Sequence, residues 1–154
     1  ACPDAHFVIA GRGESLARYR RMMVHPERFE VRDEYIPRAD VPRLFQEAAL
    51  VALPYVEASQ SAVVPLAYAF GKPVVASAVG GLPEMVEDGQ DGLLVPPRDS
   101  DRLAAAIVAL LRDDERRRRM QAHIRLKVAG ELSWDSIARS TLRVYEESRG
   151  EGEG

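Results

Sequence analysis

The sequence predicts an α/β protein, a Rossmann-like three-layer α/β/α sandwich built on a parallel sheet. The first observation is a regular alternation of short apolar runs with amphipathic stretches, which is typical of βαβ units. The second is that 154 residues, 46% of them apolar and 29% charged, fit one domain with a single core. Parallel strands joined by right-handed crossovers gather their carboxyl ends, and any ligand, at one edge of the sheet.

Strands are predicted where the apolar runs are short. The runs at 5–11, 49–55, 72–79 and 92–97 read as buried strands, while 28–36 alternates apolar and charged residues and reads as a partly exposed strand. The residues predicted to form the core are Phe7, Val8, Ile9, Leu50, Val51, Leu53, Val74, Val75, Leu93 and Leu94.

Helices are predicted over 14–24, 39–48, 61–71, 99–113, 114–130 and 133–149. Asp40, Asp99 or Ser100, and Ser133 precede three of them as N-cap residues, and Gly71 closes another. The inner face of the helix at 99–113 is predicted to carry Leu103, Ile107, Leu110 and Leu111. The domain is expected to cover 1–149, with a disordered Gly/Glu tail at 150–154.

Composition excludes several functions. A net charge of −3 gives no reason to expect a nucleic acid partner. The run at 114–119, DERRRR, reads as a solvated helix face with a Glu115–Arg119 pair. A single cysteine, Cys2, allows no internal disulfide and fits a cytoplasmic location, and no run is long enough to span a bilayer. All but two of the 21 basic residues are arginine, which favours a GC-rich bacterial genome.

No catalytic triad or metal motif is visible. His6, His25 and His123 are scattered and lack zinc-ligand spacing, so neither a metal nor a cofactor is predicted.

Three segments at the predicted ligand edge favour an anion. Gly11-Arg12-Gly13 places a cation between glycines after the first strand, and 59–64 opens a helix whose first N–H groups are unpaired. Gly80-Gly81 follows the fourth strand and allows backbone to approach a ligand closely. The alternatives are that Ser59 and Ser61 only cap a helix and that Arg12 is a solvated loop cation. Together the segments favour a phosphate-bearing ligand.

The stretch 55–99, with GKPVVASAVGGLPEMVEDGQDGLLVPPRD at its end, resembles the C-terminal domain of glycosyltransferase family 4, a retaining family with the GT-B fold. The runs HFVIAGRGE, LFQEAALVALPY and SWDSIARSTLRVYEE match the same outline. The resemblance implies a metal-independent transfer of a sugar from a UDP- or GDP-linked donor to a glycan or lipid acceptor, as in polysaccharide biosynthesis. This domain would hold the nucleotide-sugar donor.

The resemblance also implies site residues. The family carries two glutamates around the helix after the third strand, and their positions hold Ala58 and Leu66 here. Glu57, one place earlier, is the candidate catalytic residue, whereas Leu66 cannot bind a ribose hydroxyl. Donor contacts are expected from backbone amides in that segment and from the other edge residues. The predicted donor-binding residues are Gly11, Arg12, Gly13, Gln60, Ser61, Ala62, Val63, Gly80, Gly81 and Glu84.

The chain further resembles only the donor half of such an enzyme. The family's Arg/Lys loop after the first strand of this domain has no match, and the N-terminal acceptor domain is expected as a missing partner. The segments at 114–149 would then pack toward that half and leave an exposed apolar patch. The fragment alone is expected to be inactive, and membrane contact is expected only through the parent enzyme.

Two other functions remain open. Without both glutamates, the domain would be a non-catalytic module that senses a nucleotide-sugar. A nicotinamide dinucleotide-binding domain is the other alternative, but the third Gly of its fingerprint is missing, and the acid candidate, Glu34, lies in a poorly apolar strand.

Overall fold

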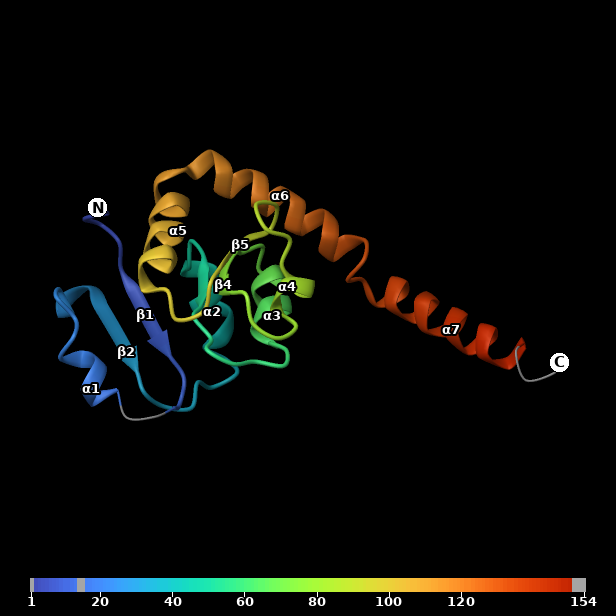
Figure 1. Cartoon of the computed structure of the whole chain (residues 1–154), viewed down its shortest axis with the longest axis horizontal. Coiled ribbons are helices and arrows are strands. Elements are labelled where there is room, and N and C mark those ends of the chain that lie inside the picture. The colour runs from blue at the N-terminus through green and yellow to red at the C-terminus, as the bar shows by residue number, and fades with distance from the viewer. Residues whose placement is uncertain (1, 14–15, 151–154) are drawn as a thin grey trace.

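The computed structural model describes residues 2–13 and 16–150 and confirms the predicted α/β class (Figure 1). The predicted tail lies outside these residues except for Gly150, which belongs to the last helix. The strands are β1 (Phe7–Ala10), β2 (Phe29–Arg32), β3 (Val51–Leu53), β4 (Val74–Ser77) and β5 (Gly92–Val95). The helices are α1 (Ala17–Arg20), the 3-10 turn η1 (Pro26–Arg28), α2 (Val41–Glu47), α3 (Val63–Ala69), α4 (Leu82–Met85), α5 (Ser100–Arg112), α6 (Asp114–Ala129) and α7 (Trp134–Gly150).

All strand pairs are parallel, but they form two sheets instead of the predicted single sheet. One sheet pairs β1 with β2, and the other has the order β3-β4-β5. The sheets are separate because β1 and β3 are not hydrogen-bonded to each other.

The helix termini follow their capping residues. The Asp99 side chain accepts a hydrogen bond from the Arg102 N–H at 2.9 Å, and the Ser133 hydroxyl accepts one from the Ser136 N–H at 3.2 Å. Gly71, with φ of +65°, closes α3 as predicted. Asp40 is wrong as a side-chain cap, because its own backbone is already helical and its carboxylate makes no capping bond. Of the predicted helix at 14–24, residues 14 and 15 lie outside the described residues, and the rest contains only the single turn of α1. Hydrogen bonds from the Met22 N–H to the Tyr19 carbonyl and from the Met23 N–H to the Arg20 carbonyl close that turn.

The core lies on both faces of β4, whose four residues are all buried. Val74 and Ala76 pack against α3, α4 and α6 on one face, and Val75 packs against α5 and α6 on the other. This arrangement gives the predicted three layers. Leu53, Val74 and Val75 are buried as predicted, whereas Ile9, Leu50, Val51, Leu93 and Leu94 are half-buried. On α5, Leu110 is fully buried, while Leu103, Ile107 and Leu111 are half-buried.

The prediction that Phe7 and Val8 belong to the core is wrong, because their side chains are 37% and 46% exposed. Phe7 stacks on Phe29 of β2 with ring centroids 5.0 Å apart. Among the described residues no strand is hydrogen-bonded to the other edge of β1, and its apolar sequence is left partly in water.

The last helix stands apart from the body of the molecule. Figure 1 shows α7 running away from the sheets at the far end of the chain. It carries the exposed apolar residues Trp134, Ile137, Leu142, Val144 and Tyr145. By contrast α6 packs on α3 and α5, although its Leu126 is 74% exposed, so the apolar surface that was predicted for 114–149 lies mainly on α7. Within the described residues, none of the helices combines the length and the hydropathy needed to cross a bilayer.

We expect Val75→Ala to lower the free energy of unfolding by about 1–3 kcal/mol, because it opens a cavity in the fully buried middle strand. Urea unfolding followed by circular dichroism measures the change. Val24→Ala is the matched control, since Val24 is 85% exposed and should be nearly neutral. A neutral Val75→Ala would contradict the central place of β4.

Candidate functional site

The predicted site residues lie at the carboxyl ends of the strands. In Figure 1 the arrow of β1 points to the lower edge of the molecule, and the connections that follow β1, β2 and β3 run along that edge. Gly11 comes directly after β1, the segment 54–62 follows β3, and Gly80 and Gly81 follow β4. The fold therefore puts the predicted segments on the edge where parallel sheets bind ligands.

Two of these segments are in contact. The Gly81 N–H donates to the Ser59 carbonyl at 2.9 Å. A Cβ on Gly80 would lie 1.5 Å from the Ala58 carbonyl oxygen, and one on Gly81 would lie 2.7 Å from that of Ser59. The glycine pair was interpreted as a place where backbone approaches a ligand. In the structure it instead lets the loop at 58–60 pack directly on the turn after β4.

Ser61 is a structural residue of this loop. It is 5% exposed, and its Oγ accepts a hydrogen bond from the Val63 N–H at 3.2 Å and lies 3.4 Å from the Tyr55 hydroxyl. Ser61 thus binds the first amide of α3, but the N-cap position is held by Ala62, which makes no side-chain cap bond. The helix begins at Val63 instead of the predicted residue 61. The Val63 amide is already hydrogen-bonded.

The loop leaves other amides available. Within the described residues, the N–H groups of Gln60, Ser61 and Ala62 have no protein acceptor. Three consecutive unpaired N–H groups before a helix can stabilise a negative charge through hydrogen bonds and the peptide dipoles. This is the strongest anion-compatible feature at the edge.

The remaining predicted residues follow strands at the same edge, and within the described residues no hydrogen bond joins them to this loop. Gly11, with φ of +137°, donates its N–H to the Arg32 carbonyl at 3.1 Å and belongs to the other sheet. Arg12 and Gly13, which follow it, are exposed. Glu57 is also exposed, and so is Glu84 in the first turn of α4.

Leu66 lies in the second turn of α3 and is half-buried, so no carboxylate stands at that position.

Arg98 was not among the predicted donor-binding residues. It follows β5 at the same edge and is the one non-glycine residue in the described ranges with a positive φ, +59°. A left-handed backbone is strained for arginine and is often found at functional sites. The available signal was a cation placed between the end of a strand and the Asp99 cap.

A second polar cluster lies at the opposite edge of the sheet. Asp91, which is fully buried, accepts hydrogen bonds from the Tyr68 hydroxyl at 2.6 Å and from Lys127 Nζ at 2.6 Å. Lys127 Nζ also donates to Glu87 Oε1 at 2.6 Å, and His123 Nε2 lies 3.3 Å from Glu87 Oε2. These five residues, the Asp91 cluster, join α3, the turn before β5 and α6.

Three members of the Asp91 cluster are close enough together to ligate a metal ion. The candidate ligand atoms of Glu87, Asp91 and His123 lie within 4.8 Å of one another. Lys127 already places its ammonium 2.6 Å from both carboxylates. Because the lysine supplies the positive charge, we assign the cluster a structural role.

The Asp91 cluster predicts a loss of stability in alkali. Burial, together with the hydrogen bond to Asp91, raises the pKa of Tyr68 well above its usual range. Burial by itself would lower the pKa of Lys127, but the hydrogen bonds to Asp91 and Glu87 outweigh it and raise that pKa. Both groups are protonated in the native state, while in the unfolded chain they lose their protons near pH 10.

The contribution of these two groups to the free energy of unfolding should therefore be constant below about pH 9 and fall as the pH rises above about 10. Urea unfolding from pH 8 to 11 measures it. Tyr68→Phe removes one of the two groups and should flatten the alkaline decline. An equally steep decline in that variant would contradict a contribution from Tyr68.

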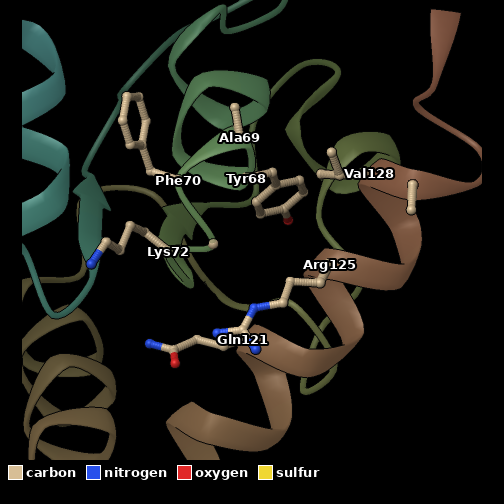
Figure 2. A pocket seen from close by; sticks show the side chains of 9 residues that line it. Tyr68, Ala69, Phe70, Lys72, Gln121, Arg125 and Val128 are labelled. Atoms are coloured by element: carbon tan, nitrogen blue, oxygen red, sulfur yellow. The ribbon is translucent and has the colours of Figure 1, made fainter.

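A hollow of about 420 Å³ lies at the C-terminal end of α3, between that helix and α6. Figure 2 shows Gln121 and Arg125 of α6 and Lys72 beside it, with Tyr68 and Phe70 from the α3 side. Burial lowers the pKa of Lys72, whose Nζ donates to the Gln46 carbonyl at 3.0 Å. None of the predicted site residues lines this hollow, so it is separate from the carboxyl-edge site.

The predicted Glu115–Arg119 pair forms at 2.8 Å on the exposed side of α6. Arg117 departs from the predicted solvated face, because its side chain is mostly buried and donates to the Leu110 and Leu111 carbonyls.

Comparison with known proteins identifies the family. The model of the family described as "Glycosyl transferases group 1" matches residues 1–113. A relative from Nocardioides, named D-inositol 3-phosphate glycosyltransferase, is 40% identical over 116 residues, which cover 75% of this chain and 25% of the relative. The chain thus spans about a quarter of the length of that protein.

Two solved structures have a fold similar to that of this chain. Sucrose-phosphate synthase from Thermosynechococcus elongatus aligns over 93% of this chain and 38% of its own, with a TM-score of 0.72 and 28% identity. Anabaena HepE, solved with UDP-glucose, aligns over 96% of this chain and 42% of its own, with a TM-score of 0.76 and 24% identity. The chain belongs to the group 1 glycosyl transferases, and its fold is that of the C-terminal domain of a GT-B glycosyltransferase.

Proposed function

We propose that this chain is the donor-binding domain of a retaining, metal-independent glycosyltransferase of family 4. It holds a UDP- or GDP-linked sugar for transfer to a glycan or lipid acceptor. The acceptor is bound by an N-terminal domain outside this chain. The parent enzyme acts in the bacterial cytoplasm, in polysaccharide biosynthesis, and meets a membrane only through the rest of the enzyme.

The observation that carries the proposal is the loop at 58–62. Its unpaired N–H groups lie at the carboxyl ends of the strands. The Gly80-Gly81 turn packs on the loop and holds it through the Gly81–Ser59 hydrogen bond. A diphosphate needs oriented donors of this kind, since preorganised dipoles stabilise the charge that develops on a leaving nucleotide. That HepE, with the same fold, was solved with UDP-glucose supports a nucleotide-sugar as the ligand.

The other edge residues take supporting roles in this proposal. Arg12 contributes positive charge from the glycine loop after β1, and Glu57 is the carboxylate nearest along the chain to the amide loop. Glu84 and the Gly80-Gly81 turn border the sugar side of the donor. Leu66 stands where the family has a glutamate that binds the ribose hydroxyls. Because leucine cannot make that contact, we expect the isolated domain to bind its donor weakly.

Calorimetric titration with UDP, GDP, UDP-glucose and NAD tests the ligand class. We expect binding of at least one uridine or guanosine nucleotide at about millimolar strength and none of NAD. Gly81→Val should abolish that binding, because its side chain would collide with the Ser59 carbonyl. Tight NAD binding with no binding of the other three would replace this proposal by the dinucleotide-binding alternative.

The non-catalytic alternative differs in the whole enzyme. Leu66→Glu restores the carboxylate position in α3. If the wild-type parent enzyme transfers sugar, the domain is part of a catalyst. If the parent enzyme transfers none and only the Leu66→Glu variant does, the wild-type domain is a nucleotide-sugar sensor.

A further inference from the structure

The hollow between the C-terminal end of α3 and α6 has the size of a small-molecule site. Its volume of about 420 Å³ falls within the range of about 300–1,000 Å³ that such sites usually have. The loop at 58–62 precedes α3, whereas the hollow lies where that helix ends. The hollow is therefore a second candidate site, at the opposite end of α3 from the loop.

The hollow carries uncompensated positive charge. Lys72 and Arg125 line it, and none of the lining residues that the structure describes is acidic. The carbonyl groups at the end of α3 add a partial negative charge, which amounts to about half an elementary charge at most. Two formal positive charges outweigh it, so the hollow favours an anion.

Arg125 lacks a partner for its charge. The positions three and four residues away from it on α6 hold glutamine, alanine and valine, so no carboxylate one turn away can pair with it. In the part of the chain that the structure describes, its guanidinium forms neither a hydrogen bond nor an ion pair. Arg117 and Arg119 of the same helix pair instead with Asp114 and Glu115. The Arg125 guanidinium is thus available to a ligand.

Two side chains of α6 reach into the hollow. Figure 2 shows Arg125 and Gln121 extending from α6 toward the side of Lys72 and the end of α3. The Gln121 amide also has no hydrogen bond among the described residues. A guanidinium offers two parallel N–H groups that match two oxygens of a carboxylate or phosphate, and an amide NH₂ beside it adds another donor.

Lys72 contributes charge without pointing at Arg125. Its Nζ donates to the Gln46 carbonyl at 3.0 Å, and in Figure 2 it points away from Arg125. Burial lowers the pKa of Lys72, and among the described residues no acidic neighbour offsets that effect. An anion in the hollow would supply the missing negative charge.

The rest of the hollow is apolar. Ala69 of α3 and Val128 of α6 line it beside the Tyr68 ring (Figure 2). Tyr68 is held in place, because its hydroxyl donates to Asp91 at 2.6 Å. A ligand that fills the hollow therefore needs an apolar body as well as an anionic group.

We infer that the hollow between α3 and α6 binds a small organic anion. Its carboxylate or phosphate group accepts hydrogen bonds from Arg125 and Gln121, and Lys72 adds an attractive charge. Its apolar body lies against Ala69 and Val128. The inference rests on the hollow alone and does not depend on the proposed donor site.

Proton–nitrogen NMR spectra of the isotopically labelled chain, titrated with benzoate, phenyl phosphate and benzamide, test the inference. The first two carry the alternative anionic groups on the same ring, and benzamide is a neutral analogue of benzoate. We expect at least one anion to shift the Arg125 Nε–H and Gln121 side-chain amide signals saturably at about millimolar concentration, and benzamide to leave them unchanged. The inference is overturned if neither anion shifts these signals up to about 20 mM, or if benzamide shifts them as much as benzoate. The amides of residues 60–62 report on the donor loop in the same spectra, so the two sites succeed or fail separately.

Matched variants identify the binding groups. Arg125→Ala should weaken anion binding, read from the Gln121 signals, by about tenfold or more. Arg118→Ala should leave it unchanged, because Arg118 is exposed on the same helix and does not line the hollow. Ala69→Glu places a carboxylate on the wall of the hollow and should also abolish binding, whereas Ala105→Glu makes the same charge change on the exposed side of α5 and should not. Equal binding by the two arginine variants, or unchanged binding by Ala69→Glu, would contradict the site.

Discussion

Gly80→Ala is expected to be among the most damaging single-atom additions to this chain, lowering the free energy of unfolding by about 3 kcal/mol or more. The new Cβ would lie 1.5 Å from the Ala58 carbonyl oxygen, in a backbone with φ of +52°. The contact is with main chain, so no flexible side chain can move aside. Either the loop at 58–60 or the turn after β4 must shift, and the unpaired amides at 60–62 would lose their arrangement. Urea unfolding gives the stability, and nucleotide titration gives the effect on the loop.

Gly89→Ala separates the clash from backbone strain. Gly89 also has a positive φ, +82°, but a Cβ there meets no atom within 4 Å. It should cost about 1 kcal/mol and leave nucleotide binding intact. If the two variants were equally stable and bound nucleotide equally, the packing of the glycine turn on the loop would not matter.

Asp91→Ala is expected to lower the free energy of unfolding by about 3–5 kcal/mol. The fully buried carboxylate accepts hydrogen bonds from the Tyr68 hydroxyl, the Glu87 N–H and Lys127 Nζ. Its removal leaves three donors facing a cavity, one of them charged. Since the cluster joins α3, the turn before β5 and α6, the loss should appear as a lower midpoint for the whole domain.

Glu87→Gln is the matched control, because Glu87 contacts the same lysine from a half-exposed position and should cost less than about 1 kcal/mol. The double variant Asp91→Asn with Lys127→Met removes both charges together. Its loss of stability should be smaller than the sum of the two single losses, because Lys127→Met alone leaves the buried Asp91 carboxylate without its cation. Strict additivity would show that the two groups do not interact.

Much of the fold could be predicted because the local signals agree with one another. The apolar run of β4, the Asp99 cap and Gly71 each determine an element through contacts close in the chain or through burial on both faces. β1 shows the limit of this reasoning. Its apolar run predicted a buried strand, but burial depends on a neighbour that is distant in sequence, so Phe7 and Val8 are exposed.

The site was predictable as a location more than as a set of contacts. Strand order placed the loop at 58–62 and the Gly80-Gly81 turn at one edge. That Gly80 packs on the Ala58 carbonyl, and that Ser61 turns inward to Val63, depends on side-chain and backbone packing that no spacing encodes. The Asp91 cluster was missed because its members are dispersed over 60 positions of the sequence and meet only when α6 packs on α3.

The most direct test of the donor site is chemical-shift mapping on the isotopically labelled chain with UDP and with GDP. At about 10 mM nucleotide we expect the largest amide shifts at Gln60, Ser61 and Ala62, with smaller ones at 80–84 and 11–13. Shifts confined to the hollow beside Lys72 and Arg125, or to any surface away from the carboxyl edge, would contradict the proposed donor site even if the nucleotide bound tightly.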